Sequence, residues 1–91
     1  MAVNHVEGVC KAKILVYALS TCVWCKKAKQ LLGELGVAYD FLDVDSLAGE
    51  EKQNVMSDLR KFNPQCSFPT ILINDKCIAG FKESEIKAAL V

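Results

Sequence analysis

Short apolar runs alternate with amphipathic stretches along this chain, and the alternation predicts its secondary structure. Residues 13–19 form a nearly continuous apolar run, which is typical of a strand buried on both faces. Residues 23–36 place apolar side chains on one helical stripe and lysine, glutamine and glutamate on the other side. Gly36 suits the C-terminal cap of that helix. A buried strand is therefore expected to lead directly into a helix.

The remainder of the chain predicts further helices and strands. Asp45 or Ser46 is the expected cap of a helix that starts near Leu47. Asn63-Pro64 ends this helix, because proline cannot continue a helix and disfavours helical geometry in the residue before it. The expected elements are strands at 37–44, 70–73 and 76–79, the last two as a hairpin, and helices at 47–62 and 83–90.

The predicted order of elements, β-α-β-α-β-β-α, favours an α/β fold with one mixed four-stranded sheet and helices on both faces. A helix joins the first two strands, so they should be parallel with a right-handed crossover. Residues 12–91 are expected to form one domain, and residues 1–11 an N-terminal arm or an extra edge strand. The turn after the first strand then lies at the C-terminal edge of a central strand, where open α/β sheets place their sites.

Composition narrows the classes of function. Eleven basic and eleven acidic side chains cancel, which argues against a nucleic-acid partner and against a polybasic membrane surface. No apolar run approaches the roughly 20 residues that a membrane span needs. Residues 1–8 lack the basic start and apolar stretch of a secretory signal, so a soluble, cytoplasmic monomer is expected. The odd number of cysteines, five, argues against a fully paired disulfide framework.

Cys22 and Cys25 stand three residues apart, where the first strand ends and the helix begins. The first backbone N–H groups of a helix have no partner within it and carry partial positive charge. A Cys22 thiolate is stabilised there, and Lys26 and Lys27 add positive charge, so its pKa should fall from about 8.5 toward neutrality. Cys25 lies inside the first turn and should keep a higher pKa. Cys22 is then the nucleophile that attacks a substrate disulfide, and Cys25 resolves the mixed disulfide.

Zinc binding and chance spacing are the alternatives to redox chemistry at this pair. A CxxC pair is a common half of a zinc site, but zinc requires two further ligands. Cys66 and Cys77 do not form a second CxxC. A CxxC between a buried strand and a helix favours a redox pair and no metal site. Of the other cysteines, Cys77 is expected in the core, Cys10 on an exposed arm, and Cys66 as an ordinary buried or loop thiol.

The segment Ser67-Phe68-Pro69-Thr70 precedes the third strand and supplies the second half of the predicted site. The third strand should lie beside the first, which brings Pro69 next to the cysteines. A cis bond at Pro69 turns the backbone of Phe68 toward a groove beside Cys22. A substrate peptide or glutathione would pair with that backbone as an added strand.

Together these features resemble the glutaredoxins of the thioredoxin fold over about residues 12–91. The resemblance rests on the order of elements, the strand–CxxC–helix unit, the Ser-Phe-Pro-Thr segment, and an Ala-Gly-Phe turn before the last helix. It implies a thiol–disulfide oxidoreductase in which Cys22 attacks, Cys25 resolves and Pro69 is cis. It also implies disulfide-containing proteins as partners and no tightly bound cofactor, with glutathione as one candidate reductant.

Aromatic side chains beside the thiols complete the candidate substrate site. Trp24 sits between the two cysteines, and an aromatic residue next to a reactive thiol is typical of a protein-docking surface. Phe81 is a second candidate for that surface. The predicted substrate-binding residues are Trp24, Phe68, Pro69, Gly80 and Phe81.

Departures from the usual glutaredoxin pattern bear on the electron donor. Val23-Trp24 replaces the usual Pro-Tyr or Pro-Phe, and Leu19 stands where many glutaredoxins carry a lysine that pairs with a glutathione carboxylate. The pattern Gly80-Phe81-Lys82 is closer to glutaredoxin-like hydrogen donors of ribonucleotide reductase and to glutaredoxin-like proteins paired with ferredoxin-dependent reductases. A ferredoxin- or NADPH-dependent protein reductase is therefore favoured over glutathione. A [2Fe–2S] cluster carrier, as some glutaredoxin-like proteins are, is the alternative function.

Overall fold

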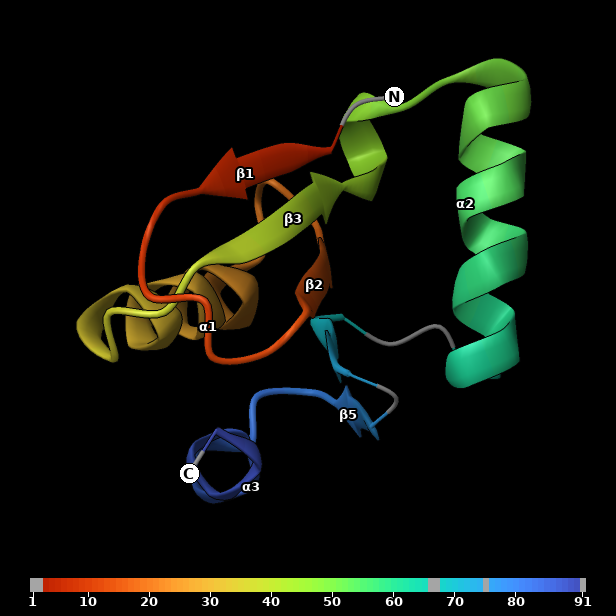
Figure 1. Ribbon diagram of the computed structural model, residues 1–91. Coiled ribbons are helices and arrows are strands. Elements are labelled where there is room, and N and C mark those ends of the chain that lie inside the picture. The colour runs from red at the N-terminus through yellow and green to blue at the C-terminus, as the bar shows by residue number, and fades with distance from the viewer. Residues whose placement is uncertain (1–2, 66–67, 75, 91) are drawn as a thin grey trace.

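The computed structural model describes residues 3–65, 68–74 and 76–90. Within them lies one sheet with the strand order β1-β3-β2-β4-β5 (Figure 1). Strand β2 is parallel to β3 and antiparallel to β4, and β5 is antiparallel to β4. In chain order the elements are β1 (Asn4–Val6), β2 (Ile14–Ala18), α1 (Val23–Glu34), β3 (Tyr39–Asp43), η1 (Val44–Ser46), α2 (Gly49–Phe62), β4 (Thr70–Ile73), β5 (Lys76–Ala79) and α3 (Glu83–Ala89).

The expected count of four strands is corrected by β1, which pairs antiparallel with β3 at the edge of the sheet. This three-residue strand is mostly exposed and has no alternating apolar pattern, so the sequence gives little signal for it. Contacts distant in sequence hold it: the His5 imidazole lies 2.6 Å from the Asp40 carboxylate on β3. The backbone at Gly8 then runs so close to Val37 that an added Cβ would lie 2.6 Å from its carbonyl carbon.

The expected cap of α2 is also corrected, because Asp45 and Ser46 belong to the short 3₁₀ helix η1. The Ser46 hydroxyl donates to the Asp43 carbonyl at 2.7 Å, and the Asp45 carboxylate accepts hydrogen bonds from Ser20. Helix α2 instead begins at Gly49, and its N-cap residue Ala48 makes no side-chain capping bond. Both side chains are therefore engaged elsewhere, that of Asp45 at the loop that carries the cysteines.

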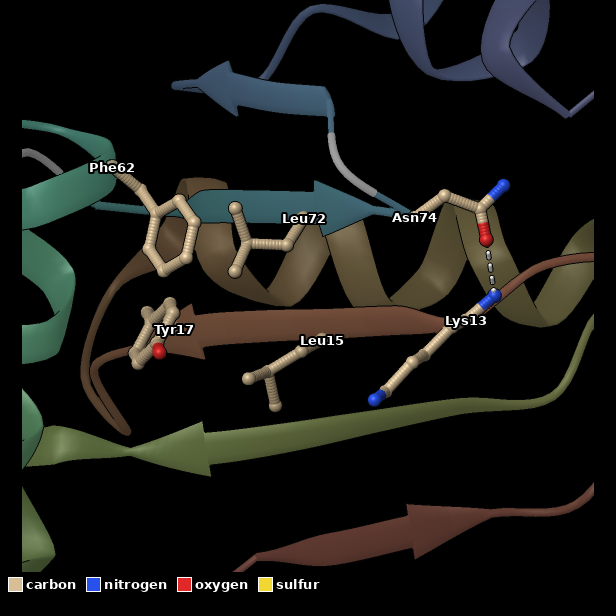
Figure 2. A pocket seen from close by; sticks show the side chains of 6 residues that line it. All are labelled: Lys13, Leu15, Tyr17, Phe62, Leu72 and Asn74. Atoms are coloured by element: carbon tan, nitrogen blue, oxygen red, sulfur yellow. Dashed lines mark hydrogen bonds between the residues drawn. The ribbon is translucent and has the colours of Figure 1, made fainter.

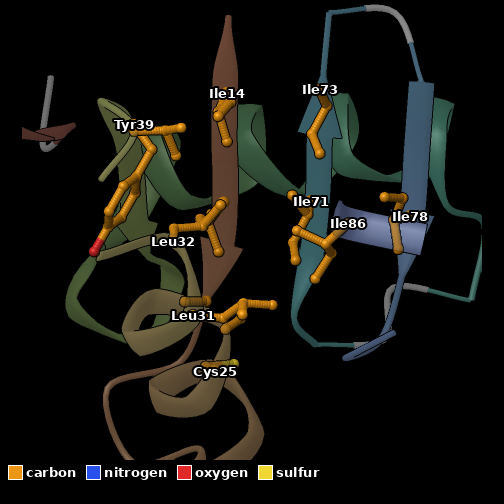
Figure 3. Packing of buried hydrophobic residues seen from close by; sticks show 13 residues of the cluster. Ile14, Cys25, Leu31, Leu32, Tyr39, Ile71, Ile73, Ile78 and Ile86 are labelled. Atoms are coloured by element: carbon orange, nitrogen blue, oxygen red, sulfur yellow. The ribbon is translucent and has the colours of Figure 1, made fainter. Parts of the chain in front are cut away.

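Two apolar clusters pack against opposite faces of the sheet, which confirms the expected α/β arrangement with helices on both faces. On one face α1 and α3 contribute side chains such as Leu32 and Ile86, which pack in one cluster with Ile14 and Ile71 from the central strands (Figure 3). On the other face Val55 and other residues of α2 pack against the sheet. Figure 1 shows α2 on the opposite side of the molecule from α1 and α3.

No helix within the described ranges is both long enough and apolar enough to cross a membrane.

Candidate redox-active site

Helix α1 begins directly after Cys22, which is its N-cap residue with an extended backbone. The Cys22 Sγ accepts a hydrogen bond from the backbone N–H of Cys25, with a distance of 3.3 Å between sulfur and nitrogen. The N–H groups of a first helical turn have no intrahelical acceptor, so a sulfur at this position replaces the side-chain oxygen that usually caps a helix. The sequence thus places Cys22 where a thiolate is stabilised by the end of a helix.

The loop before Cys22 is tied to the end of the neighbouring strand. The backbone N–H of Ser20 donates to Asp45 Oδ1 at 2.9 Å, and the Ser20 hydroxyl donates to the other oxygen of the same carboxylate. These bonds hold the pKa of Asp45 below its usual range. Because β2 and β3 are parallel neighbours, the tether fixes the cysteine loop at their shared C-terminal edge.

The two thiols ionise differently. Partial burial tends to raise the pKa of Cys22, but hydrogen bonds from the Cys25 thiol and from the backbone N–H groups of Cys25 and Trp24 outweigh it, so the pKa lies below its ordinary value. Burial raises the pKa of Cys25 to about 12, and its hydrogen bond to Cys22 adds to this increase. Both cysteines are free thiols, and Cys25 is completely buried. One sulfur is therefore a ready nucleophile, and the other is held back as a thiol.

The lysines that follow the cysteines make contacts of their own. The causes of the lowered Cys22 pKa are hydrogen bonds, and the charges of Lys26 and Lys27 are not among them. The Lys27 ammonium lies over the Trp24 ring, 4.5 Å from its centroid. A third lysine, Lys29, forms a partly buried ion pair with Asp43 at 3.0 Å, which the sequence reasoning missed. The one available signal was its place one helical turn after Cys25.

Titration of the Cys22 alkylation rate provides a direct measure of this asymmetry. We expect the rate with iodoacetamide to rise with pH and level off with an inflection clearly below that of a free cysteine, because the thiolate is the reactive form. Mass spectrometry should find the first label on Cys22 and none on Cys25. A small free thiol such as N-acetylcysteine, alkylated in parallel, serves as the reference. An inflection at the same pH for Cys22 and for this free thiol would contradict the assignment.

A hydrogen bond between their backbones brings Pro69 and Gly80 together. The Phe68–Pro69 peptide bond is cis, as the resemblance implies, and Pro69 is fully buried. The backbone N–H of Gly80 donates to the Pro69 carbonyl at 2.7 Å, and Gly80 has a positive φ of 86° with open space where a Cβ would stand. The buried Asn63 side chain donates to the Thr70 hydroxyl at 3.0 Å and joins the end of α2 to the start of β4.

Trp24 and Phe81 stack on each other, with ring centroids 6.1 Å apart and ring planes inclined by 27°. Trp24 is 55% exposed, and Val23 beside it is 62% exposed. Phe68 is half-buried and packs against the apolar clusters of both sheet faces. Trp24 and Phe81 therefore come together next to the CxxC turn, a contact that no local pattern in the sequence indicates.

The remaining cysteines lie apart from the pair. Cys10 is exposed, as expected, whereas Cys77 is only half-buried, because it lies on the edge strand β5 and packs at the margin of the α2-side cluster. Burial raises the pKa of the Cys77 thiol. Cys66 and Ser67 fall outside the described residues. In the part of the chain that the structure describes, no three histidine, cysteine or acidic side chains are grouped to hold a metal ion.

A separate cavity of about 460 Å³ opens on the α2 side of the sheet (Figure 2). Its floor consists of Leu15, Tyr17 and Leu72, and Phe62 of α2 forms one wall. At the other end the backbone N–H of Lys13 donates to the Asn74 side chain at 3.1 Å. None of its lining residues is a cysteine, so the cavity is distinct from the redox pair.

Comparisons with known proteins agree with this geometry. The glutaredoxin family model matches residues 14–78. A glutaredoxin-like 8.6 kDa protein from the rubredoxin operon of Clostridium pasteurianum is 36% identical over 73 residues, which cover 80% of this chain and 91% of that protein. Other curated glutaredoxins from bacteria and plants are longer, and this chain covers 62% to 69% of their length.

Solved structures show the same relationship. The crystal structure of a glutaredoxin from Methanosarcina mazei Go1 is 53% identical, with a TM-score of 0.89, and the match covers 99% of this chain and 88% of that one. Methanoredoxin from Methanosarcina acetivorans is 52% identical, with a TM-score of 0.87, and the match covers 91% of this chain and 88% of that one. With a thiol of lowered pKa at a helix end, a buried second thiol and a cis-proline before β4, the chain belongs to the glutaredoxin family of thiol–disulfide oxidoreductases.

Proposed function

We propose that this chain reduces disulfide bonds in other proteins through the Cys22–Cys25 pair and is itself re-reduced by a protein reductase. The observation that carries the proposal is the asymmetry of the two thiols, one capping α1 with a lowered pKa and one buried with a raised pKa. A pair with this asymmetry favours attack by the first sulfur followed by resolution by the second.

The reaction proceeds in two exchanges. The Cys22 thiolate attacks one sulfur of the substrate disulfide, a mixed disulfide forms, and the other substrate sulfur leaves as a thiolate. Cys25 then loses its proton and attacks the Cys22 sulfur. The second substrate sulfur leaves, and the Cys22–Cys25 disulfide forms. Two electrons have passed to the substrate, and a donor dithiol must return two electrons to the chain.

The proposed substrate surface surrounds Cys22. The exposed stack of Trp24 on Phe81 offers an apolar anchor for a protein partner, of the aromatic kind that dominates binding at interfaces. Phe68 and Pro69 border the site from the start of β4, and the bond between Pro69 and Gly80 holds the turn before α3 beside them. An extended substrate segment would pair with the Phe68 backbone as an added strand.

Side-chain placement supports a protein reductase, of the ferredoxin- or NADPH-dependent kind, over glutathione as the donor. Leu19, where many glutaredoxins carry a glutathione-binding lysine, turns toward the α2-side apolar cluster. Two nearby cations already have partners, since Lys27 lies over Trp24 and Lys82 is 3.6 Å from Glu85. The anionic carboxylates of glutathione would therefore meet a weakly basic surface.

Reduction of a protein disulfide with different donors tests the proposal. Oxidised chain is mixed with insulin as substrate and with reduced glutathione, an NADPH-dependent thioredoxin reductase, or a ferredoxin-dependent reductase with reduced ferredoxin. We expect an enzyme donor to support faster insulin reduction than millimolar glutathione. A Leu19→Lys variant should raise only the glutathione-dependent rate, because it restores the missing cation. Two results together would overturn the choice of a protein reductase as donor. They are insulin reduction with glutathione and with no other donor, and a glutathione-dependent rate that is the same in the Leu19→Lys variant.

A further inference from the structure

Lys29 and Asp43 form an ion pair between α1, the helix that carries the cysteines, and β3. The Lys29 Nζ lies 3.0 Å from Asp43 Oδ1, and the two side chains are only 21% and 22% exposed. Asp43 ends β3 and is the register partner of Ala18 on β2, so the carboxylate is anchored in the sheet. The Lys29 ammonium also lies over the Phe41 ring, 4.0 Å from its centroid. Both contacts restrict a side chain that is usually mobile at a protein surface.

Lys29 follows Cys25 by one turn of α1, so the two side chains lie on the same side of the helix. The cluster that contains Cys25 is apolar except for the Tyr39 hydroxyl, which donates to the Lys29 carbonyl at 3.4 Å. Burial raises the pKa of Cys25, its bond to Cys22 and the Cys22 charge raise it further, and the Leu19 backbone N–H and the Lys29 charge lower it. Lys29 is thus the cation that opposes the burial of the resolving thiol.

The resolving step requires this thiol to lose its proton inside an apolar cluster. In the mixed disulfide the Cys22 sulfur is bonded to the substrate and carries neither a thiol proton nor a negative charge. The part of the Cys25 pKa increase that comes from Cys22 is then removed. Burial remains as the opposing effect, and the favourable contributions come from Leu19 and Lys29. A cation near a buried thiolate stabilises it strongly, since the surroundings screen the charge weakly.

We propose that Lys29, held in place by Asp43, is a positioning residue that accelerates the resolving step by stabilising the Cys25 thiolate. The inference rests on the proposed two-thiol function and assigns the ion pair a role in its second exchange. In that exchange the Cys25 proton passes to solvent or to the departing substrate thiolate, the bond between Cys22 and the substrate breaks, and the Cys22–Cys25 bond forms. Lys29 itself transfers nothing.

Ellman's reagent separates the two exchanges in one stopped-flow trace. The reduced chain, with Cys10, Cys66 and Cys77 replaced by alanine, is mixed with a limiting amount of reagent. Attack by Cys22 releases the first coloured thiolate at a rate proportional to protein concentration. Resolution by Cys25 releases the second coloured thiolate at a rate that does not depend on protein concentration. We expect Lys29→Met to slow the second phase only and to move its pH profile to higher pH.

The size of the effect follows from thiolate chemistry. Each unit of added pKa lowers the thiolate fraction of Cys25 about tenfold and raises its intrinsic nucleophilicity about threefold, so the second phase should slow about three- to fourfold per unit. Lys29→Arg keeps the charge and should restore most of the rate. Lys61→Met is the matched control, because Lys61 also pairs with an aspartate, at 3.8 Å on the exposed face of α2.

Several results would overturn the inference. The first is that Lys29→Met slows both phases equally, and the second is that it leaves the second phase unchanged. The third is that Lys29→Arg slows the second phase as much as Lys29→Met does. If Lys29→Met does not fold, Lys29→Gln removes the charge with a polar side chain of similar shape, and the same expectations apply. Absence of a second phase in the chain with Lys29 intact would instead reject the proposed two-thiol function.

Discussion

A Cys25→Ser chain is expected to stop after the first exchange, with the substrate covalently attached to Cys22. The serine hydroxyl has the size to fill the buried position but cannot attack a disulfide. The rate at which a protein disulfide is reduced with an enzyme donor should fall about a hundredfold or more. A thiol held next to the reacting sulfur has a much higher effective concentration than any thiol in solution. Non-reducing electrophoresis should show the adduct, and peptide mass spectrometry should place it on Cys22.

The reciprocal variant is the control for this experiment. Cys22→Ser removes the thiolate that caps α1 and leaves the buried Cys25 thiol, and burial alone still raises the pKa of Cys25, which keeps it protonated near neutrality. It should form no adduct and reduce no disulfide. An adduct at Cys10 in the Cys25→Ser variant, in place of one at Cys22, would show that exposure alone determines reactivity in this chain.

The elements that carry the site were accessible from sequence because their signals are local. Residues 70–73 and 76–79 are apolar runs on either side of a short turn, and the structure has strands at the same positions. The run up to Leu19 and the helical stripe after Val23 likewise fix where the CxxC turn must lie. A helix N-terminus gives the same electrostatic environment in any fold, so the lowered pKa of Cys22 could be argued before its neighbours were known.

The features that were missed or left open depend on contacts between segments far apart in sequence. An extra edge strand was one of two expectations for residues 1–11, and β1 forms because β3 offers an edge to pair with, while its own residues carry no strand pattern. Asp45 resembled a helix cap in the sequence, but in the fold it meets Ser20, 25 residues earlier. The ion pair of Lys29 with Asp43 likewise joins α1 to β3. Tertiary proximity determines each of these, and no local pattern encodes it.

The local and distant features combine in how the two thiols are kept different. The helix end alone would activate Cys22, but it would not keep Cys25 protonated. The apolar cluster of α1, α3 and the sheet does so by excluding water from the second sulfur. The reactivity of the site therefore depends on the packing of α1 as well as on its first turn.

Replacement of Leu32 by alanine should test that dependence, with Leu35→Ala as the matched control in the same segment. Leu32 is completely buried in the cluster that contains Cys25, whereas Leu35 is 37% exposed at the end of α1. We expect Leu32→Ala to lower the free energy of unfolding by about 2–5 kcal/mol and Leu35→Ala by less than about 1 kcal/mol, as measured by urea denaturation of the reduced protein.

Because a domain of this kind is stable by only about 5–15 kcal/mol, the Leu32 variant should also expose Cys25 to alkylation in native buffer. A loss for Leu32→Ala as small as that expected for Leu35→Ala would mean that the α1 cluster contributes little to stability, and the burial of Cys25 would then need another cause.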